Sequence, residues 1–92
     1  MSHERAIAIE SIRDERERQE RLMTNDDGTP CDESDKGNTA NDWAAIVLSY
    51  VGRAAKTWRN AREGEPFRAN MVKAAATCLA AIEAFDKGYV TE

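Results

Sequence analysis

A long apolar repeat in the last third of the chain is the feature that most limits its fold. Its members are spaced 4, 3, 4, 4, 3 and 4 residues apart: Phe67, Met71, Ala74, Cys78, Ile82, Phe85 and Tyr89. Steps of three and four residues place side chains on one face of an α-helix. Pro66 suits the first helical position, and Gly88 suits the end. The sequence therefore predicts a helix over residues 66–87, with the repeat as its packing seam and Cys78 as a small core residue.

A second helix is predicted over residues 43–62. Its apolar stripe has the same spacing and comprises Trp43, Ile46, Val47, Tyr50, Val51, Ala54 and Trp58. Thr39, followed three residues later by Asp42, resembles a capping arrangement that would start this helix at Thr39 or Asn41. The alanines of the last helix allow a neighbour to approach closely, and the connection around Gly64 is short. We therefore expect these two helices to form an antiparallel hairpin.

The first 22 residues predict a charged helix. They contain five Arg and six Asp or Glu, and Ser2 can cap the start. Four pairs of opposite charge are four residues apart and can form ion pairs along a helix: Arg13–Glu17, Asp14–Arg18, Arg16–Glu20 and Glu17–Arg21. Ile9, Ile12, Gln19 and Leu22 share a face, but no apolar residue lies between Ile12 and Leu22. We expect this helix either to stand in solvent or to contact another molecule.

Residues 23–42 predict an acidic loop. Six Asp or Glu accompany a single Lys36, and Gly28, Pro30 and Gly37 favour turns. An EF-hand calcium loop needs a glycine at its sixth position and an acidic ligand at its twelfth. With Gly28 or Gly37 at the sixth position, the twelfth is Ser34 or Trp43, so both registers fail. We interpret the segment as a solvated loop and predict no metal site.

Length and charge favour one small domain, residues 1–92, that associates with another chain. At this size a single core is marginal, so we expect a homo-oligomer. The net charge of −4 argues against general coating of nucleic acid, which requires an overall basic surplus. Two cysteines do not make a disulfide framework, and no segment resembles a signal peptide or a membrane span. These features indicate a reducing compartment and predict a cytoplasmic protein that does not contact a membrane.

The chain becomes basic between Arg53 and Lys73, and aromatic residues lie among the cations. Cations offer charge-assisted hydrogen bonds to an anion, and rings offer a stacking face. A helix C-terminus decorated with favourable charge would explain part of this cluster. The predicted hairpin places Trp58, Arg59, Arg62 and Arg68 together at one of its ends. Lys73 lies farther along the last helix. We predict a partner-binding set of Arg53, Lys56, Trp58, Arg59, Arg62, Phe67 and Arg68.

No catalytic constellation accompanies the basic stretch. His3 is the only histidine, so no Ser/His or Cys/His pair can form around an internal base. Glu17 with Glu20, and Glu83 with Asp86, have the spacing by which all-α nucleotide pyrophosphohydrolases hold magnesium. In that family the two motifs lie much closer in sequence. A magnesium-dependent hydrolase is therefore an alternative to our prediction of a non-enzymatic protein without cofactors.

A set of motifs in order resembles a group of short phage and prophage proteins. The motifs are residues 15–19 (ERERQ), Thr24 with residues 26–27 (DD), residues 70–76 (NMVKAAA), and residues 82–83 (IE) before residues 86–87 (DK). The group tends to have a histidine where this chain has Asn25, and a tryptophan-rich turn that is reduced here to Trp58 and residues 64–67. Small phage proteins of this kind are often counter-defence factors, such as anti-CRISPR inhibitors or sponges for immune nucleotide signals.

Together these features predict an all-α domain: a charged N-terminal helix, an acidic loop and an Ala-rich antiparallel hairpin. The resemblance implies a phage-type interaction protein in the host cytoplasm that inhibits a bacterial defence system. It would bind a CRISPR effector complex, at a surface that holds RNA or DNA, or sequester an anionic nucleotide signal. An oligomeric helical scaffold is a further alternative, in which the Ala-rich seams and the charged helix mediate self-association only.

Overall fold

The chain folds into three helices in the part that the structure describes. A computed structural model describes residues 2–22, 38–60 and 65–90, apart from the side chains at positions 56–60, 65 and 66. The helices are α1 (His3–Leu22), α3 (Ala40–Asn60) and α4 (Glu65–Asp86), and these residues contain no strand. The predicted all-α class is confirmed. The second helix begins three residues earlier than residue 43, so residues 40–42 of the acidic loop expected over 23–42 belong to it. Residues 23–37 of that loop lie outside the described residues.

Short-range polar contacts fix the helix ends, as the sequence predicted. Ser2 accepts a hydrogen bond from the Arg5 backbone N–H at 3.1 Å and caps α1. Thr39 and Asp42 form a reciprocal capping box, because each backbone N–H donates to the other's side chain, at 2.9 and 3.2 Å. These bonds satisfy amide groups that have no partner inside the helix.

Gly88 ends α4 in a left-handed conformation, with φ of 79°. Its N–H donates to the Phe85 carbonyl, and the Tyr89 N–H donates to the Ala84 carbonyl, both at 2.9 Å. This is the Schellman arrangement, which favours glycine because a Cβ atom is strained at positive φ. Tyr89 and Val90 then pack against the core cluster of Trp43, Ala80 and Ala84.

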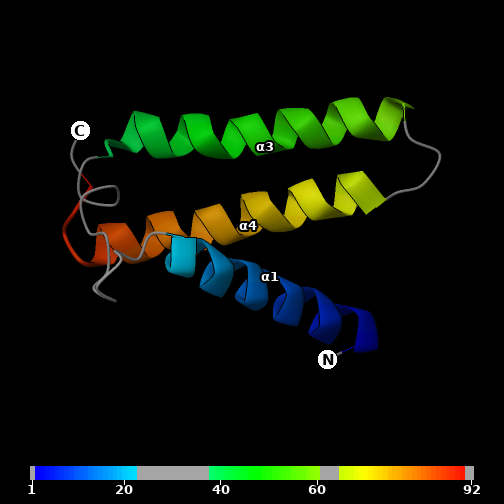
Figure 1. The fold of residues 1–92 in the computed structure, drawn as a ribbon. Coiled ribbons are helices and arrows are strands. Elements are labelled where there is room, and N and C mark those ends of the chain that lie inside the picture. Colours follow the sequence, from blue (N-terminus) through cyan, green and yellow to red (C-terminus); the bar gives the residue numbers. More distant parts are fainter. Residues whose placement is uncertain (1, 23–37, 61–64, 91–92) are drawn as a thin grey trace.

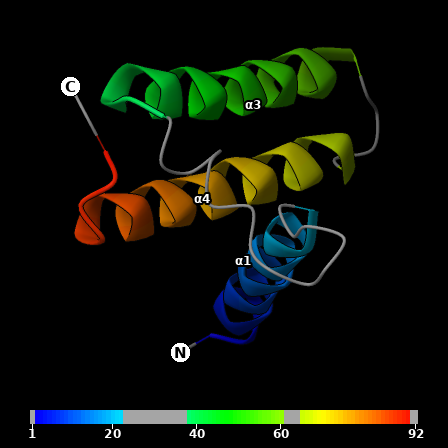
Figure 2. The ribbon, with the colours of Figure 1, turned by 60° about the vertical axis from the view of Figure 1, so that its left-hand side comes forward.

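Helix α4 lies between the other two helices. Figures 1 and 2 show α3 running antiparallel beside α4, while α1 crosses α4 on another side. The predicted antiparallel hairpin is therefore present. The charged helix α1 is not isolated in solvent, because its C-terminal part lies against α4, whereas its N-terminal turns diverge from it (Figures 1 and 2).

Alanines, with Trp43, form the core of the described residues. The buried apolar side chains are Trp43, Ala54, Ala74, Ala76, Ala80 and Ala84. The prediction of the 67–89 repeat as a packing seam was wrong for most of its members. Ala74 is buried and Tyr89 half-buried, whereas Phe67, Met71, Cys78, Ile82 and Phe85 are all exposed. Alanine lets helix axes approach closely, so α1 and α3 pack on the alanine faces and leave the bulkier stripe outside.

The predicted inner face of α1 is confirmed in part. Ile12 and Gln19 are half-buried on it, whereas Ile9 and Leu22 are exposed, at 41% and 69% of their surface. Arg16, at 9%, is the buried residue of this face. The Arg16 guanidinium lies 3.4 Å from the Glu83 carboxylate of α4 and 3.7 Å from that of Glu20. A buried charge is tolerable only where it is paired, so Glu83 makes this inward orientation possible.

Of the four predicted ion pairs in α1, only Arg16–Glu20 forms within the described residues. Arg18 pairs instead with Glu15, three residues earlier, at 2.7 Å.

None of the helices in the described residues is both long enough and apolar enough to cross a membrane.

Candidate functional site

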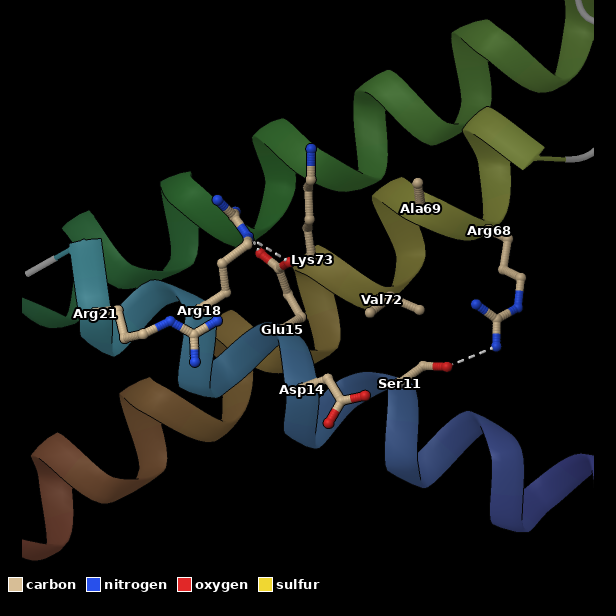
Figure 3. A pocket seen from close by; sticks show the side chains of 9 residues that line it. All are labelled: Ser11, Asp14, Glu15, Arg18, Arg21, Arg68, Ala69, Val72 and Lys73. Carbon is tan, nitrogen blue, oxygen red and sulfur yellow. Dashed lines mark hydrogen bonds and ion pairs between the residues drawn. The ribbon is translucent and has the colours of Figure 1, made fainter.

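An open groove of about 450 Å³ lies between α1 and α4 (Figure 3). Helix α1 contributes residues spaced by one or three positions: Ser11, Asp14, Glu15, Arg18 and Arg21. Helix α4 contributes Arg68, Ala69, Val72 and Lys73. Side chains at such spacings lie along one side of a helix, so two polar rows face each other across the groove. The lining holds four cations and two carboxylates, a positive excess in a chain that is negative overall.

Glu15 and Arg18 form the strongest ionic contact in the groove. Two guanidinium nitrogens of Arg18 donate to the two Glu15 carboxylate oxygens, at 2.7 and 2.8 Å, and Gln19 adds a donor at 3.2 Å. The Arg18 hydrogen bonds hold the pKa of Glu15 below its ordinary value, despite an opposing effect of burial. Because the two charges satisfy each other, this pair builds the wall of the groove more than it attracts a ligand.

The other cations of the groove form no ion pair within the described residues. Arg68 donates a hydrogen bond to the Ser11 hydroxyl at 2.9 Å, which ties α4 to α1 (Figure 3). Arg21 and Lys73 line the groove without a carboxylate within 4.0 Å in the described part of the chain. An incoming anion would not have to displace an ion-pair partner of these side chains in the described part of the chain. Arg21 and Lys73 are therefore the cations most available for charge-assisted hydrogen bonds.

The sequence-predicted binding set is only partly visible in the structure. Arg62 and the side chains of Lys56, Trp58 and Arg59 lie outside the described residues. Arg53 is exposed on α3, with its guanidinium 5.3 Å from the Tyr50 ring centroid. Phe67 is on the exposed stripe of α4, and Arg68 is in the groove. Whether these residues form one cluster at the end of the hairpin stays a prediction.

Sequence reasoning missed the groove because its cations come from two distant segments. Arg18 and Arg21 belong to a run in which charges of both signs alternate, so neither stood out. Lys73 was placed apart from the other basic residues, whereas the structure puts it in the same groove as Arg68. The spacing of Arg68 and Lys73 on one helix was the available signal. That spacing could not show that α1 packs beside this surface of α4 and turns it into a groove.

A second hollow, of about 200 Å³, lies where the three helices meet. Its lining is Arg16, Arg18, Gln19, Leu22, Asn38, Trp43, Ile46, Tyr50, Thr77 and Ala80. Two buried donors from this lining, Arg16 Nε and Trp43 Nε1, have no hydrogen-bond partner in the described residues. A hollow of this size has room for water, which could satisfy both donors.

The two acidic motifs of the hydrolase alternative lie on different helices. Glu17 and Glu20 belong to α1, and Glu83 and Asp86 belong to α4. Arg16 contacts one member of each motif, Glu20 and Glu83. Among the residues that the structure describes, no group of three or more His, Cys, Asp or Glu side chains could hold a metal ion.

Comparison with known proteins gives no relative from which to transfer a function. No family model, curated protein or solved structure matches this chain. The functional argument therefore depends on the groove itself.

Proposed function

We propose that this chain is a non-catalytic interaction protein that binds an acidic surface of a partner protein through the groove between α1 and α4. The observation that carries the proposal is the pair of available cations, Arg21 and Lys73, on facing helices of one open groove. Arg68 adds a third positive group, held in place by its hydrogen bond to Ser11. Figure 3 shows these cations spread along the groove, so each can meet a different carboxylate of one partner, and several charge-assisted bonds can form together.

The lining of the groove favours a protein partner over a nucleotide. The lining residues that the structure describes include no aromatic ring, so they offer a nucleobase no stacking face. Asp14 also lies in the groove and would repel a phosphate that came close to it. Carboxylate side chains spaced along a partner's surface can meet the cations separately and avoid Asp14. Sequestration of an anionic nucleotide signal is thus the less favoured form of the proposal.

We further propose that the partner belongs to a bacterial defence system, so that binding inhibits it. Support for this narrower step comes from the motif resemblance to phage and prophage proteins, including the NMVKAAA segment that carries Lys73. A basic groove suits an acidic face of a CRISPR effector complex. It does not suit the channel that holds RNA or DNA, because such channels are themselves basic.

The decisive experiment compares two charge-reversed double variants in a cell-based assay of CRISPR interference with plaque formation. Arg21→Glu/Lys73→Glu changes the groove, whereas Arg5→Glu/Arg13→Glu makes the same change in net charge at exposed positions of α1 outside it. We expect the groove variant to lose inhibition and the control to keep it, with both helical by circular dichroism. Equal activity of the two variants would remove the groove from the proposal.

A direct measurement separates the two partner classes. Purified protein is titrated against a fluorescent oligo-glutamate peptide and, separately, against a fluorescent cyclic oligonucleotide, at two salt concentrations. Binding of the peptide, weakened by salt and by Arg21→Glu/Lys73→Glu, supports an acidic protein surface. Binding of the nucleotide alone would overturn that choice in favour of the signal sponge.

A further inference from the structure

The exposed stripe of α4 is the largest apolar feature without a partner among the described residues. Five exposed side chains lie within a narrow sector of the helix: Phe67, Met71, Cys78, Ile82 and Phe85. The two phenylalanines mark the limits, since Phe67 is 38% exposed and Phe85 is 69% exposed. With a rise of 1.5 Å per residue, the stripe is about 27 Å long. Continuous apolar surface of this kind usually marks an interface.

The rest of the fold shows why this face needs cover. The buried apolar side chains in the described residues are one tryptophan and five alanines, and no large side chain is fully buried. Most of the bulky apolar side chains of α4 are thus on its outside. A small domain with so little buried apolar surface gains stability when a second molecule covers such a stripe.

The order of residues along the stripe is nearly symmetric about Ala76. Phe67 and Phe85 each lie nine residues from this midpoint, and Met71 and Ile82 are five and six residues away. Cys78, the smallest member, lies two residues from it. Large side chains therefore occupy both ends of the exposed stripe, and a small one lies near the centre. When two such helices pack antiparallel about a two-fold axis, each end meets the opposite end of the other copy, as an isologous contact requires.

The charges beside the stripe favour the same orientation. Arg68 and Asp86 are 18 residues apart, which is five helical turns, so they lie on the same flank of α4. In an antiparallel pair, same-side flanks of the two helices face each other, and Arg68 of each copy would approach Asp86 of the other. In a parallel pair the same flanks of the two helices would lie on opposite sides of the interface, so Arg68 and Asp86 would not meet. Arg68 can make this contact and keep its bond to Ser11, because a guanidinium has five N–H donors.

We infer that the chain forms a symmetric dimer in which the α4 stripes of two copies pack antiparallel. Met71 then faces Ile82 of the other copy, and Cys78 of each copy lies near the two-fold axis. The two rings at each end, Phe67 and Phe85, come from different copies. The small side chain of Cys78 near the centre lets the helices approach closely where the axes cross. The apolar contact does not depend on the groove, because neither Arg21 nor Lys73 belongs to the stripe; only Arg68 is shared between the groove and the flank of the dimer contact.

Sedimentation velocity over a range of protein concentrations tests the inference with a matched pair of variants. Phe85 and Leu48 are almost equally exposed, at 69% and 68%, but only Phe85 is in the stripe. We expect the wild type to be a dimer and Phe85→Asp to raise its dissociation constant at least about tenfold. Leu48→Asp should leave it unchanged. A monomeric wild type at about 100 μM, or equal effects of the two variants, would overturn the dimer.

A charge swap tests the orientation without touching the apolar residues. Asp86→Arg alone should weaken the dimer, because it places two arginines together. Arg68→Asp/Asp86→Arg should restore the dissociation constant of the wild type, because the opposite charges meet again. If the swap binds more weakly than the single variant, the antiparallel arrangement is wrong. Loss of dimerisation in Phe85→Asp, which leaves the groove residues intact, with the groove assay unchanged would show that the two surfaces act separately.

Discussion

Arg16 of α1 and Glu83 of α4, 67 residues apart in the chain, join the charged helix to the hairpin through an ion pair of 3.4 Å. Arg16 is the more buried partner, with 11% of its side chain exposed against 36% for Glu83. The two helices are therefore held by a polar contact where an apolar seam would be expected. This relation makes the position of α1, and hence the shape of the groove, sensitive to a single carboxylate.

The first prediction concerns that carboxylate. Glu83→Gln leaves the buried guanidinium of Arg16 with Glu20 alone, at 3.7 Å. Losing a partner of a buried charge costs about 1–3 kcal/mol, so we expect a lower free energy of unfolding by this amount in urea denaturation. Glu17→Gln, at an exposed position without an ion pair in the described residues, should stay within about 0.5 kcal/mol of the wild type. Equal stability of the two variants would mean that the pair contributes nothing.

The same contact limits how far sequence could predict the fold. The helices and their caps were predictable, because periodicity, the Thr39–Asp42 box and Gly88 act over a few residues. The face of α1 that carries Ile12 and Gln19 was predictable too, but the burial of Arg16 on it was not, because that burial requires Glu83 from the other end of the chain. No local pattern contains that pairing.

The inner face of α4 was mispredicted for a different physical reason. Phe85 and Ile82 are more hydrophobic than alanine, so the sequence pattern predicted that they face the core. In the structure Ala76, Ala80 and Ala84, four residues apart, are buried instead. Close axial approach of three helices favours small side chains, and this gain depends on the neighbours, which sequence periodicity does not contain. The groove was missed for the same reason, since its two walls belong to separate helices.

A second prediction follows from the pKa of Glu15, which Arg18 lowers from the ordinary value of 4.5. A carboxyl group with a lower pKa in the folded state than in the unfolded state stabilises the fold above the unfolded pKa. That contribution disappears as the pH falls through the folded pKa. We therefore expect Glu15→Gln to be less stable than the wild type at pH 7, with the difference shrinking at pH values below 4.5.

Thermal unfolding of the two proteins between pH 7 and pH 3 measures this difference. Glu17→Gln again provides the control, because Glu17 is exposed and pairs with no cation in the described residues. A stability difference for Glu15→Gln that is the same at every pH would show that the variant acts through packing. The charge of the Glu15–Arg18 pair would then play no part.

Two glycines give a third prediction with opposite signs. Gly52 lies within α3, and a Cβ atom there would meet nothing within 4 Å. Gly52→Ala should therefore stabilise the protein by about 0.5–1 kcal/mol, because alanine has the higher helix propensity. Gly88 has equal space but a φ of 79°, so Gly88→Ala should destabilise the protein by about 1–2 kcal/mol. Urea denaturation of both variants checks the signs, and a stabilising Gly88→Ala would contradict the assigned helix end.

The last prediction concerns Trp43, whose indole ring is 93% buried while its Nε1 donor has no partner in the described residues. An unsatisfied buried donor costs about 1–3 kcal/mol, so Trp43→Phe removes a penalty together with some packing. We expect this variant to stay within about 1 kcal/mol of the wild type in urea, because the two effects oppose each other. Trp43→Ala, which loses the entire ring, should cost about 3–5 kcal/mol.

The comparison of the two Trp43 variants also reports on the hollow that Trp43 and Arg16 line. If Trp43→Phe costs nearly as much as Trp43→Ala, the indole N–H has a partner in solution, and ordered water in the hollow is the simplest one. The indole ¹H–¹⁵N resonance of Trp43 then decides the matter, because a bound water would give a nuclear Overhauser contact to the indole proton. Without that contact and with a small cost for Trp43→Phe, the donor is unpaired in the native protein.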